Sequence, residues 1–211
     1  MSGLRLARSG EAADLASFLG RLVALDPAAV VRLRSVGARV TAYARLPFGV
    51  LVSRTVSGDA DPADVTVGAG DLLTALDRGG RPDAVAWPAR RDMDWRAALP
   101  PVEGWVRLDS VPGEVVLKLV RAGRDTLRAV PAGAAAAAGE SLLDHESLTV
   151  TGAGRTTALP LRVLGSLTRM GFLGDGSEPV VVSVAAGWTR LAGAYGSAYQ
   201  HTVPGLALSP R

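Results

Sequence analysis

Few side chains in this sequence of 211 residues are of the types that usually carry out catalysis. The chain has no cysteine, and its two histidines are His145 and His201. Without thiols there can be no disulfide, thiolate metal site, iron–sulfur cluster or cysteine nucleophile. The spacing of the two histidines does not suggest a metal centre. We therefore expect no metal and no cofactor.

Catalysis by a histidine-activated serine is not indicated either. His145 stands between Asp144 and Glu146, and sequence neighbours at the end of a helix point in different directions. The segment 164–167 contains Gly-Ser but lacks the second glycine of a Gly-x-Ser-x-Gly turn. We expect His145 on the surface at a helix end, and we assign no catalytic residue.

One group of acids keeps an enzymatic hypothesis open. Asp92, Asp94 and Glu103 lie in a tryptophan-rich stretch, and paired carboxylates can perform acid–base chemistry. Arginines alternate with these acids, as ordinary ion pairs would require. Ion pairing is the favoured interpretation, and an enzyme that uses these carboxylates is an alternative.

Arginine-rich strands provide a candidate anion site. Between residues 39 and 46 apolar residues alternate with polar ones, which is typical of a strand with one buried and one solvated face. The polar face could bind an anionic ligand or RNA, with a tyrosine stacking on bases and arginines meeting phosphates. Alternatively it is the ordinary wet face of an antiparallel sheet, neutralised by acids of the 59–64 loop. The candidate residues are Arg32, Arg34, Arg39, Tyr43, Arg45 and Arg54.

The stretch Gly68-Ala69-Gly70-Asp71 follows a short strand and opens a helix, which is the outline of an anion-binding turn. It lacks the third glycine of a dinucleotide fingerprint and the Gly-Lys-Ser/Thr of a phosphate loop. Asp71 would repel an added anion. We expect helix capping here.

The overall charge is only mildly basic. Net charge is +3, and the pI of about 9.9 reflects arginine, since Lys118 is the only lysine among 23 basic residues. This bias is explained by a GC-rich coding sequence. No apolar run approaches the roughly 18 residues that span a bilayer, and no secretion signal is visible. We expect a cytoplasmic protein without membrane contact.

Hydrophobic periodicity predicts a strand-rich first half. A helix over 10–25 carries an apolar stripe, and three antiparallel strands follow over 30–36, 39–46 and 48–56. A strand at 65–67 and a helix at 72–77 come next. Residues 83–104 are irregular, so we place a domain boundary there: a sheet-and-helix domain over 1–104 and a helical domain over 105–211.

The second half is predicted to be mostly helical. Helices are expected over 112–130, 132–143 and 160–170, with a strand at 148–151 and a hairpin over 172–184. A last helix is expected from Trp188, with Tyr195 and Tyr199 on one face, packing on the core or on a second subunit. The predicted fold class is α+β.

Residues 148–192 resemble the second half of a winged-helix domain, with a strand, a helix ending at Gly171 and a glycine-containing hairpin. This resemblance implies nucleic-acid contacts from Arg162, Ser166 and Arg169 on the recognition helix. The segment 152–158 is too short for the extra helix that a winged helix needs. The other interpretation is a helix and hairpin that serve packing alone.

As a whole the chain resembles an uncharacterised actinobacterial protein family, through the segments 29–34, 46–52, 104–106 and 167–173. The resemblance implies a β-rich first half and a helical second half, and carries no activity. Our leading hypothesis is a non-catalytic binding protein that meets a protein partner or a second copy of itself. A nucleic-acid-binding regulator and a carboxylate enzyme are the alternatives.

Overall fold

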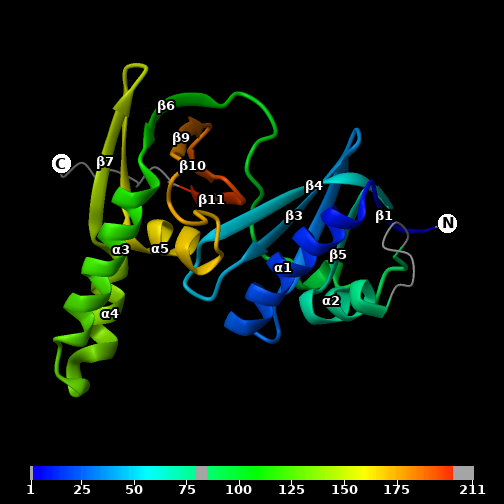
Figure 1. Cartoon of the computed structure of the whole chain (residues 1–211), viewed down its shortest axis with the longest axis horizontal. Helices are drawn as coiled ribbons and strands as arrows, with labels where there is room; N and C mark the ends of the chain where they lie inside the picture. Colours follow the sequence, from blue (N-terminus) through cyan, green and yellow to red (C-terminus); the bar gives the residue numbers. More distant parts are fainter. Residues whose placement is uncertain (1, 79–84, 202–211) are drawn as a thin grey trace, which may run out of the picture.

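The computed structural model describes residues 2–78 and 85–201, and they form an α+β fold, as predicted. Its centre is an antiparallel nine-stranded sheet in the order β5-β2-β3-β4-β11-β10-β9-β6, with β1 paired to β4. In Figure 1 the elements of the first half lie on the right and those of the second half on the left.

The first half follows the predicted order of elements, with one strand, β1, that was not predicted ahead of the first helix. The stripe of α1 is buried through Leu15, Phe18, Leu19 and Leu22, as its spacing indicates. The elements are β1 (Gly3–Leu6), α1 (Ser9–Leu25), β2 (Val30–Val36), β3 (Arg39–Arg45), β4 (Leu51–Asp61), β5 (Asp64–Gly68) and α2 (Ala69–Arg78).

The second half contains more strand than the sequence indicated. Its helices match the three that were expected, and β7 and β8 form a separate two-stranded hairpin. After η1 (Asp92–Asp94), which belongs to the first half, the elements are β6 (Val106–Val111), α3 (Gly113–Arg128), η2 (Ala132–Ala134), α4 (Ala135–Asp144), β7 (Glu146–Gly152), β8 (Arg155–Pro160), α5 (Leu161–Arg169), β9 (Val180–Ala185), β10 (Trp188–Gly193) and β11 (Gly196–His201).

The expected last helix was wrong. Residues 188–201 form β10 and β11, and β9 pairs with β10 and β6 instead of closing a hairpin over 172–184. The cause is a two-residue turn in which Ala186 and Gly187 both have positive φ, at 44° and 80°. Such a turn matches the twist of adjacent antiparallel strands. The winged-helix resemblance therefore does not extend to the fold.

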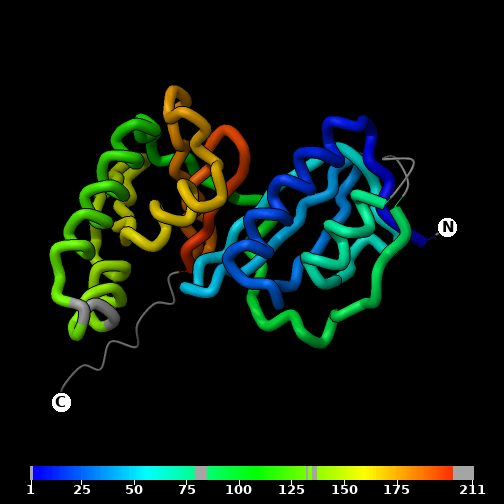
Figure 2. Tube along the Cα trace, turned by 60° about the horizontal axis from the view of Figure 1, so that its bottom comes forward, coloured from blue at the N-terminus to red at the C-terminus, as the bar shows by residue number. Residues whose placement is uncertain are grey.

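Among the described elements, α1, α2, α3 and α5 cover one face of the sheet, and α4 packs on α3 and α5. Buried residues of that face, such as Val40, Ala42 and Leu191, belong to one apolar cluster together with residues of α1 and α5. The two halves share this cluster, and Figure 2 shows them side by side along the chain trace. None of the described helices is long and apolar enough to cross a membrane.

A strand pairing and a ring stack are among the contacts that join the halves directly. Strand β4 pairs with β11 through Ser53 and Ser197 and the two residue pairs that follow. On the helical face, the rings of Phe18 in α1 and Phe172 after α5 stack at 6.2 Å, inclined by 13°. The sheet is therefore continuous across the predicted boundary at residues 104 and 105.

Candidate functional site: a groove between the sheet and the linker

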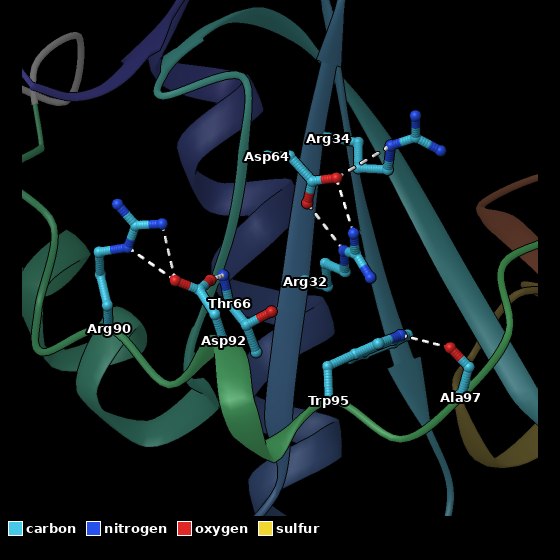
Figure 3. A network of polar contacts seen from close by, with 8 residues as sticks. All are labelled: Arg32, Arg34, Asp64, Thr66, Arg90, Asp92, Trp95 and Ala97. Carbon is cyan, nitrogen blue, oxygen red and sulfur yellow. Dashed lines mark hydrogen bonds and ion pairs between the residues drawn. The ribbon is translucent and has the colours of Figure 1, made fainter.

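The face of the sheet opposite the helices is crossed by residues 92–105, which we call the linker. The linker starts at η1, where Asp92 accepts a hydrogen bond of 2.7 Å from the backbone N–H of Thr66 in β5. The backbone N–H of Arg91 donates to the carbonyl of Thr66, also at 2.7 Å. Figure 3 shows this anchor beside the arginines of β2. The first turn of the linker is thus fixed to the edge of the sheet.

Electrostatics stabilise the anchor in its ionised form. The backbone hydrogen bond from Thr66 holds the pKa of Asp92 below its usual value, and Arg90 and Arg32 add favourable charge. The guanidinium of Arg90 binds the same carboxylate at 2.7 Å. A carboxylate held ionised in this way is a poor general acid.

Aromatic rings pack beneath the linker. Tyr199 lies 6.3 Å from Tyr43, 6.0 Å from Trp105 and 6.5 Å from Trp188, measured between ring centroids. The hydroxyl of Tyr199 shares a 3.1 Å hydrogen bond with the hydroxyl of Ser53. Burial raises the pKa of Tyr43 to about 12. This cluster supports the linker, and its rings already contact one another.

Beside this cluster lies a cavity of about 360 Å³, which we call the linker groove. Arginines from both halves of the chain line it: Arg34 and Arg39 from the first, Arg190 from the second. The guanidinium of Arg190 lies 4.5 Å from the centre of the Trp105 ring. The full lining is Arg34, Val36, Arg39, Thr41, Tyr43, Thr55, Pro100, Pro101, Val102, Trp105, Arg190 and Tyr199, which includes no carboxylate.

The arginines of the groove differ in how closely acidic side chains pair with them. Arg34 is 3.5 Å from the carboxylate of Asp64, which binds Arg32 more closely at 2.7 Å. Among the described residues, Arg39 has no ion-pair partner, and the buried Nε of Arg190 has no hydrogen-bond partner. A positively charged, partly desolvated groove favours an anionic group.

Five of the six residues predicted for the anion-binding face do share it. Arg32 opposes Tyr43 and Arg34 opposes Thr41 across β2 and β3, so their side chains lie on the same side. Arg39 and Arg45 alternate with buried residues of β3 and join them. The expected role of the 59–64 loop is seen in Asp64, which pairs with Arg32 and Arg34.

Arg54 is the exception, because it points to the helical face. It opposes Ala42 across β3 and β4, and Ala42 is fully buried. The guanidinium of Arg54 binds the carboxylate of Asp14 in α1 and the carbonyl of Tyr195. The register thus removes Arg54 from the predicted site and makes it a link between helix and sheet.

The residues predicted for nucleic-acid contact lie on α5, but they do not form one exposed set. Ser166 is fully buried and donates to the carbonyl of Val163 at 2.6 Å. Arg162 donates to the carbonyl of Phe48 at 2.8 Å and binds Asp144 at 2.5 Å. Arg169 lies over the ring of Phe48. Arg162 and Arg169 hold the β3–β4 turn against the second half.

The remaining candidates have structural partners. Asp94 pairs with Arg91 at 2.6 Å, as the alternating charges indicate, and Glu103 is exposed. The Asp71 carboxylate folds back over Gly68, so it occupies the start of α2. His145 ends α4, and the ring of His201 lies 4.5 Å from that of Trp188. Within residues 2–78 and 85–201, no group of three metal-binding side chains occurs.

The contribution of β10 and β11 to the groove was not predicted from the sequence. Arg190 opposes Tyr199 across these strands, and both side chains lie on the face opposite the helices. Arg190 lies between buried Thr189 and Leu191, and this alternation is a strand signal that the aromatic spacing concealed.

Two family profiles match the chain. Residues 1–97 match DUF8010 and residues 100–205 match DUF8185, each a domain of unknown function. The second match covers just over half of the chain. The chain belongs to the DUF8185 family. No curated protein matches it, and the prediction of an uncharacterised family is confirmed.

Solved structures with a similar fold include bacterial sliding clamps. The DNA polymerase sliding clamp of Caulobacter crescentus is 14% identical with a TM-score of 0.57, and the match covers 100% of this chain and 69% of the clamp chain. The DNA polymerase III beta subunit of Pseudomonas aeruginosa is 12% identical with a TM-score of 0.55, covering 95% and 67%. The Helicobacter pylori beta clamp bound to a DNA ligase peptide is 11% identical with a TM-score of 0.51, covering 100% and 68%. The likeness is one of fold, and this chain spans about two thirds of those chains.

Proposed function

We propose that this protein is a non-catalytic binding protein whose linker groove takes an acidic segment of a partner protein. The observation that carries the proposal is the groove itself, where Arg34, Arg39 and Arg190 converge with no carboxylate in the lining. Guanidinium groups bind carboxylates through paired, charge-assisted hydrogen bonds.

The chemistry of the groove favours a peptide over RNA. Val36 and Val102 are exposed by 59% and 63%, and Pro100 and Pro101 adjoin them, so apolar side chains of a ligand would find apolar contacts. Recognition of single-stranded RNA needs free aromatic faces on which bases stack. The rings of Tyr43, Tyr199 and Trp105 are packed against one another instead.

The structural neighbours are compatible with this proposal. One beta clamp of similar fold was solved with a DNA ligase peptide bound to it. A fold that binds peptide segments elsewhere supports peptide binding here, while the residues that would do it are those of this chain.

The test is fluorescence anisotropy with a short labelled peptide of alternating glutamate and leucine. Arg39→Glu should weaken binding at least about tenfold, because an attractive charge becomes repulsive and about 1.4 kcal/mol corresponds to tenfold. The matched control is Arg121→Glu, the same charge reversal on exposed α3. Equal binding by wild type and Arg39→Glu, or no binding by wild type, would refute the proposal.

A second candidate function is association with DNA through α3. Four basic residues are exposed on this helix, which also carries Glu114 and Asp125. They are Lys118, Arg121, Arg124 and Arg128. The neighbours of similar fold are DNA polymerase clamps. If α3 contacts phosphates, binding to duplex DNA must weaken steeply with salt.

The peptide-binding and DNA-binding candidates are distinguished by testing each charge-reversal variant with the other candidate's probe. Arg121→Glu should reduce retention of a duplex in a mobility-shift assay at low salt, and Arg39→Glu should leave it unchanged. No retention of the duplex by wild type would remove the DNA candidate without touching the peptide proposal.

We propose in addition that the protein self-associates, and that it is built from two domains, residues 1–104 and 105–211. Sedimentation equilibrium measures the first, and a strict monomer would remove a homodimer. The second is measured by urea unfolding, where we expect the two parts to unfold together, because the β4–β11 pairing and the Phe18–Phe172 stack join them.

A further inference from the structure

A small apolar pocket lies among α3, α4 and α5, remote from the linker groove. Its volume is about 130 Å³ and Phe48 of the β3–β4 turn contributes to its wall. An engineered apolar cavity of about 150 Å³ holds benzene, so this pocket has room for one phenyl or isobutyl group. Its apolar lining residues are Phe48, Val120, Leu127, Leu142, Leu143 and Leu161.

Glycines keep the pocket open. Gly139 of α4 and Gly165 of α5 both line it. A Cβ atom added to Gly165 would have no neighbour within 4 Å, and one added to Gly139 would meet only Leu127, at 3.8 Å. Glycine costs helix stability relative to alanine, and here its effect is to leave space between helices.

Polar groups without partners lie in the same wall. Nε of Arg162 and Oγ1 of Thr168 are buried, and neither has a hydrogen-bond partner in the described part of the chain. Arg124 and Arg169 also line the pocket, and neither forms an ion pair with a described residue. Asp144 and Glu140 of α4 both pair with one terminal nitrogen of Arg162, Nη2.

A pocket with apolar walls, orphan polar atoms and unpaired guanidinium groups matches one ligand chemistry. Buried polar atoms are normally hydrogen-bonded, so those left over point to a missing partner. We propose that this pocket binds a carboxylate that carries a single apolar group of phenyl or isobutyl size. The apolar group fills the pocket, and the carboxylate contacts the arginines around it.

The probe is 3-phenylpropanoate, and the neutral comparison is 3-phenylpropanamide. Binding of each compound is followed through the backbone amide chemical shifts of the full chain. Shifts should concentrate in α3, α4 and α5, and the acid should bind at least about tenfold more tightly than the amide. Arg124→Gln should reduce this preference severalfold and leave binding of the amide unchanged.

Gly165→Leu provides a variant that fills the pocket without breaking a contact, and it should abolish binding. Its matched control is Gly20→Leu in α1, where an added Cβ also meets nothing within 4 Å. Both variants should fold, because leucine favours helix over glycine. Unchanged binding by a folded Gly165→Leu variant, or equal affinity for acid and amide, would overturn the proposal.

The same titration distinguishes the two sources of such a carboxylate. A short peptide that ends in phenylalanine with a free carboxyl group is compared with its C-terminal amide and with 3-phenylpropanoate. Tighter binding of the free-carboxyl peptide assigns the pocket to a partner's C-terminus, and tighter binding of the small acid assigns it to a free metabolite. Absence of shifts in these helices with every probe would contradict the inference.

Discussion

Replacing Phe172 with alanine tests whether the two halves of the chain fold as one unit. Phe172 is only 2% exposed, and its ring stacks on Phe18 of the other half. Removing a buried phenylalanine costs about 3–5 kcal/mol, with the larger values where the site cannot collapse. The backbone at Gly196 already encloses the ring, since an added Cβ there would lie 2.5 Å from Cε1 of Phe172.

We therefore expect a loss of about 4 kcal/mol in the free energy of unfolding. Since domains are stabilised by only about 5–15 kcal/mol, this loss is a large fraction of the total. The measurement is urea unfolding followed by circular dichroism, combined with amide hydrogen exchange of β3 in the first half and β9 in the second. Exchange should accelerate in both strands, because the ring and the β4–β11 pairing couple the halves.

The control is Met93→Ala, which truncates a side chain that is 81% exposed and should change stability by less than about 0.5 kcal/mol. A double-mutant cycle with Phe18 should give a coupling of about 0.5–1.5 kcal/mol from ring stacking. Two separate unfolding transitions, with β3 unaffected by the loss of Phe172, would refute this reasoning and favour independent domains.

Three further predictions concern a close contact and two titrating groups. Gly152→Ala should lower the melting temperature by at least about 4 °C, because its Cβ would lie 2.0 Å from the carbonyl oxygen of Leu108. In the control Gly10→Ala the added Cβ has nothing within 4 Å, so the melting temperature should stay the same or rise. Equal melting temperatures for the two variants would contradict the contact. The lowered pKa of Asp92 means that its contribution to stability is present above the ordinary carboxyl pKa and is lost as pH falls through the lowered value. The acid-unfolding curve of Asp92→Asn should lack this component. Identical acid-unfolding curves for wild type and variant would exclude the anchor. Tyr43 has a pKa raised to about 12, so stability should fall as pH rises from the ordinary tyrosine pKa near 10 toward 12. In a titration followed by tyrosinate absorbance, Tyr43→Phe should lose the ionisation step at the highest pH. Loss of a step at lower pH would place Tyr43 in solvent.

The sequence alone determined the parts that depend on local periodicity. The apolar stripe of α1 and the alternation in β3 fixed which residues are buried, because each pattern has only one face that can avoid water. The α+β class followed from these patterns, and the shortage of reactive side chains indicated binding over catalysis. The pairing of Asp64 with the β2 arginines also followed from charge.

Tertiary structure decided what depends on register and on contacts between distant segments. Arg54 has the same residue type as Arg34, but its position opposite Ala42 turns it to the helical face, and a shift of one residue would reverse this. Residues 188–201 form β10 and β11 and not the predicted helix, because the turn at Ala186 and Gly187 outweighs the local aromatic spacing.

The linker groove likewise exists only in three dimensions. Arg39 and Arg190 are far apart in the sequence, and it is the antiparallel pairing of β4 with β11 that brings both into the lining of one groove. No local sequence pattern indicates that these arginines lie in one groove, since their proximity follows from the order of strands in the sheet and not from neighbouring residues. The sequence therefore provides the charges, and the sheet decides which of them act together.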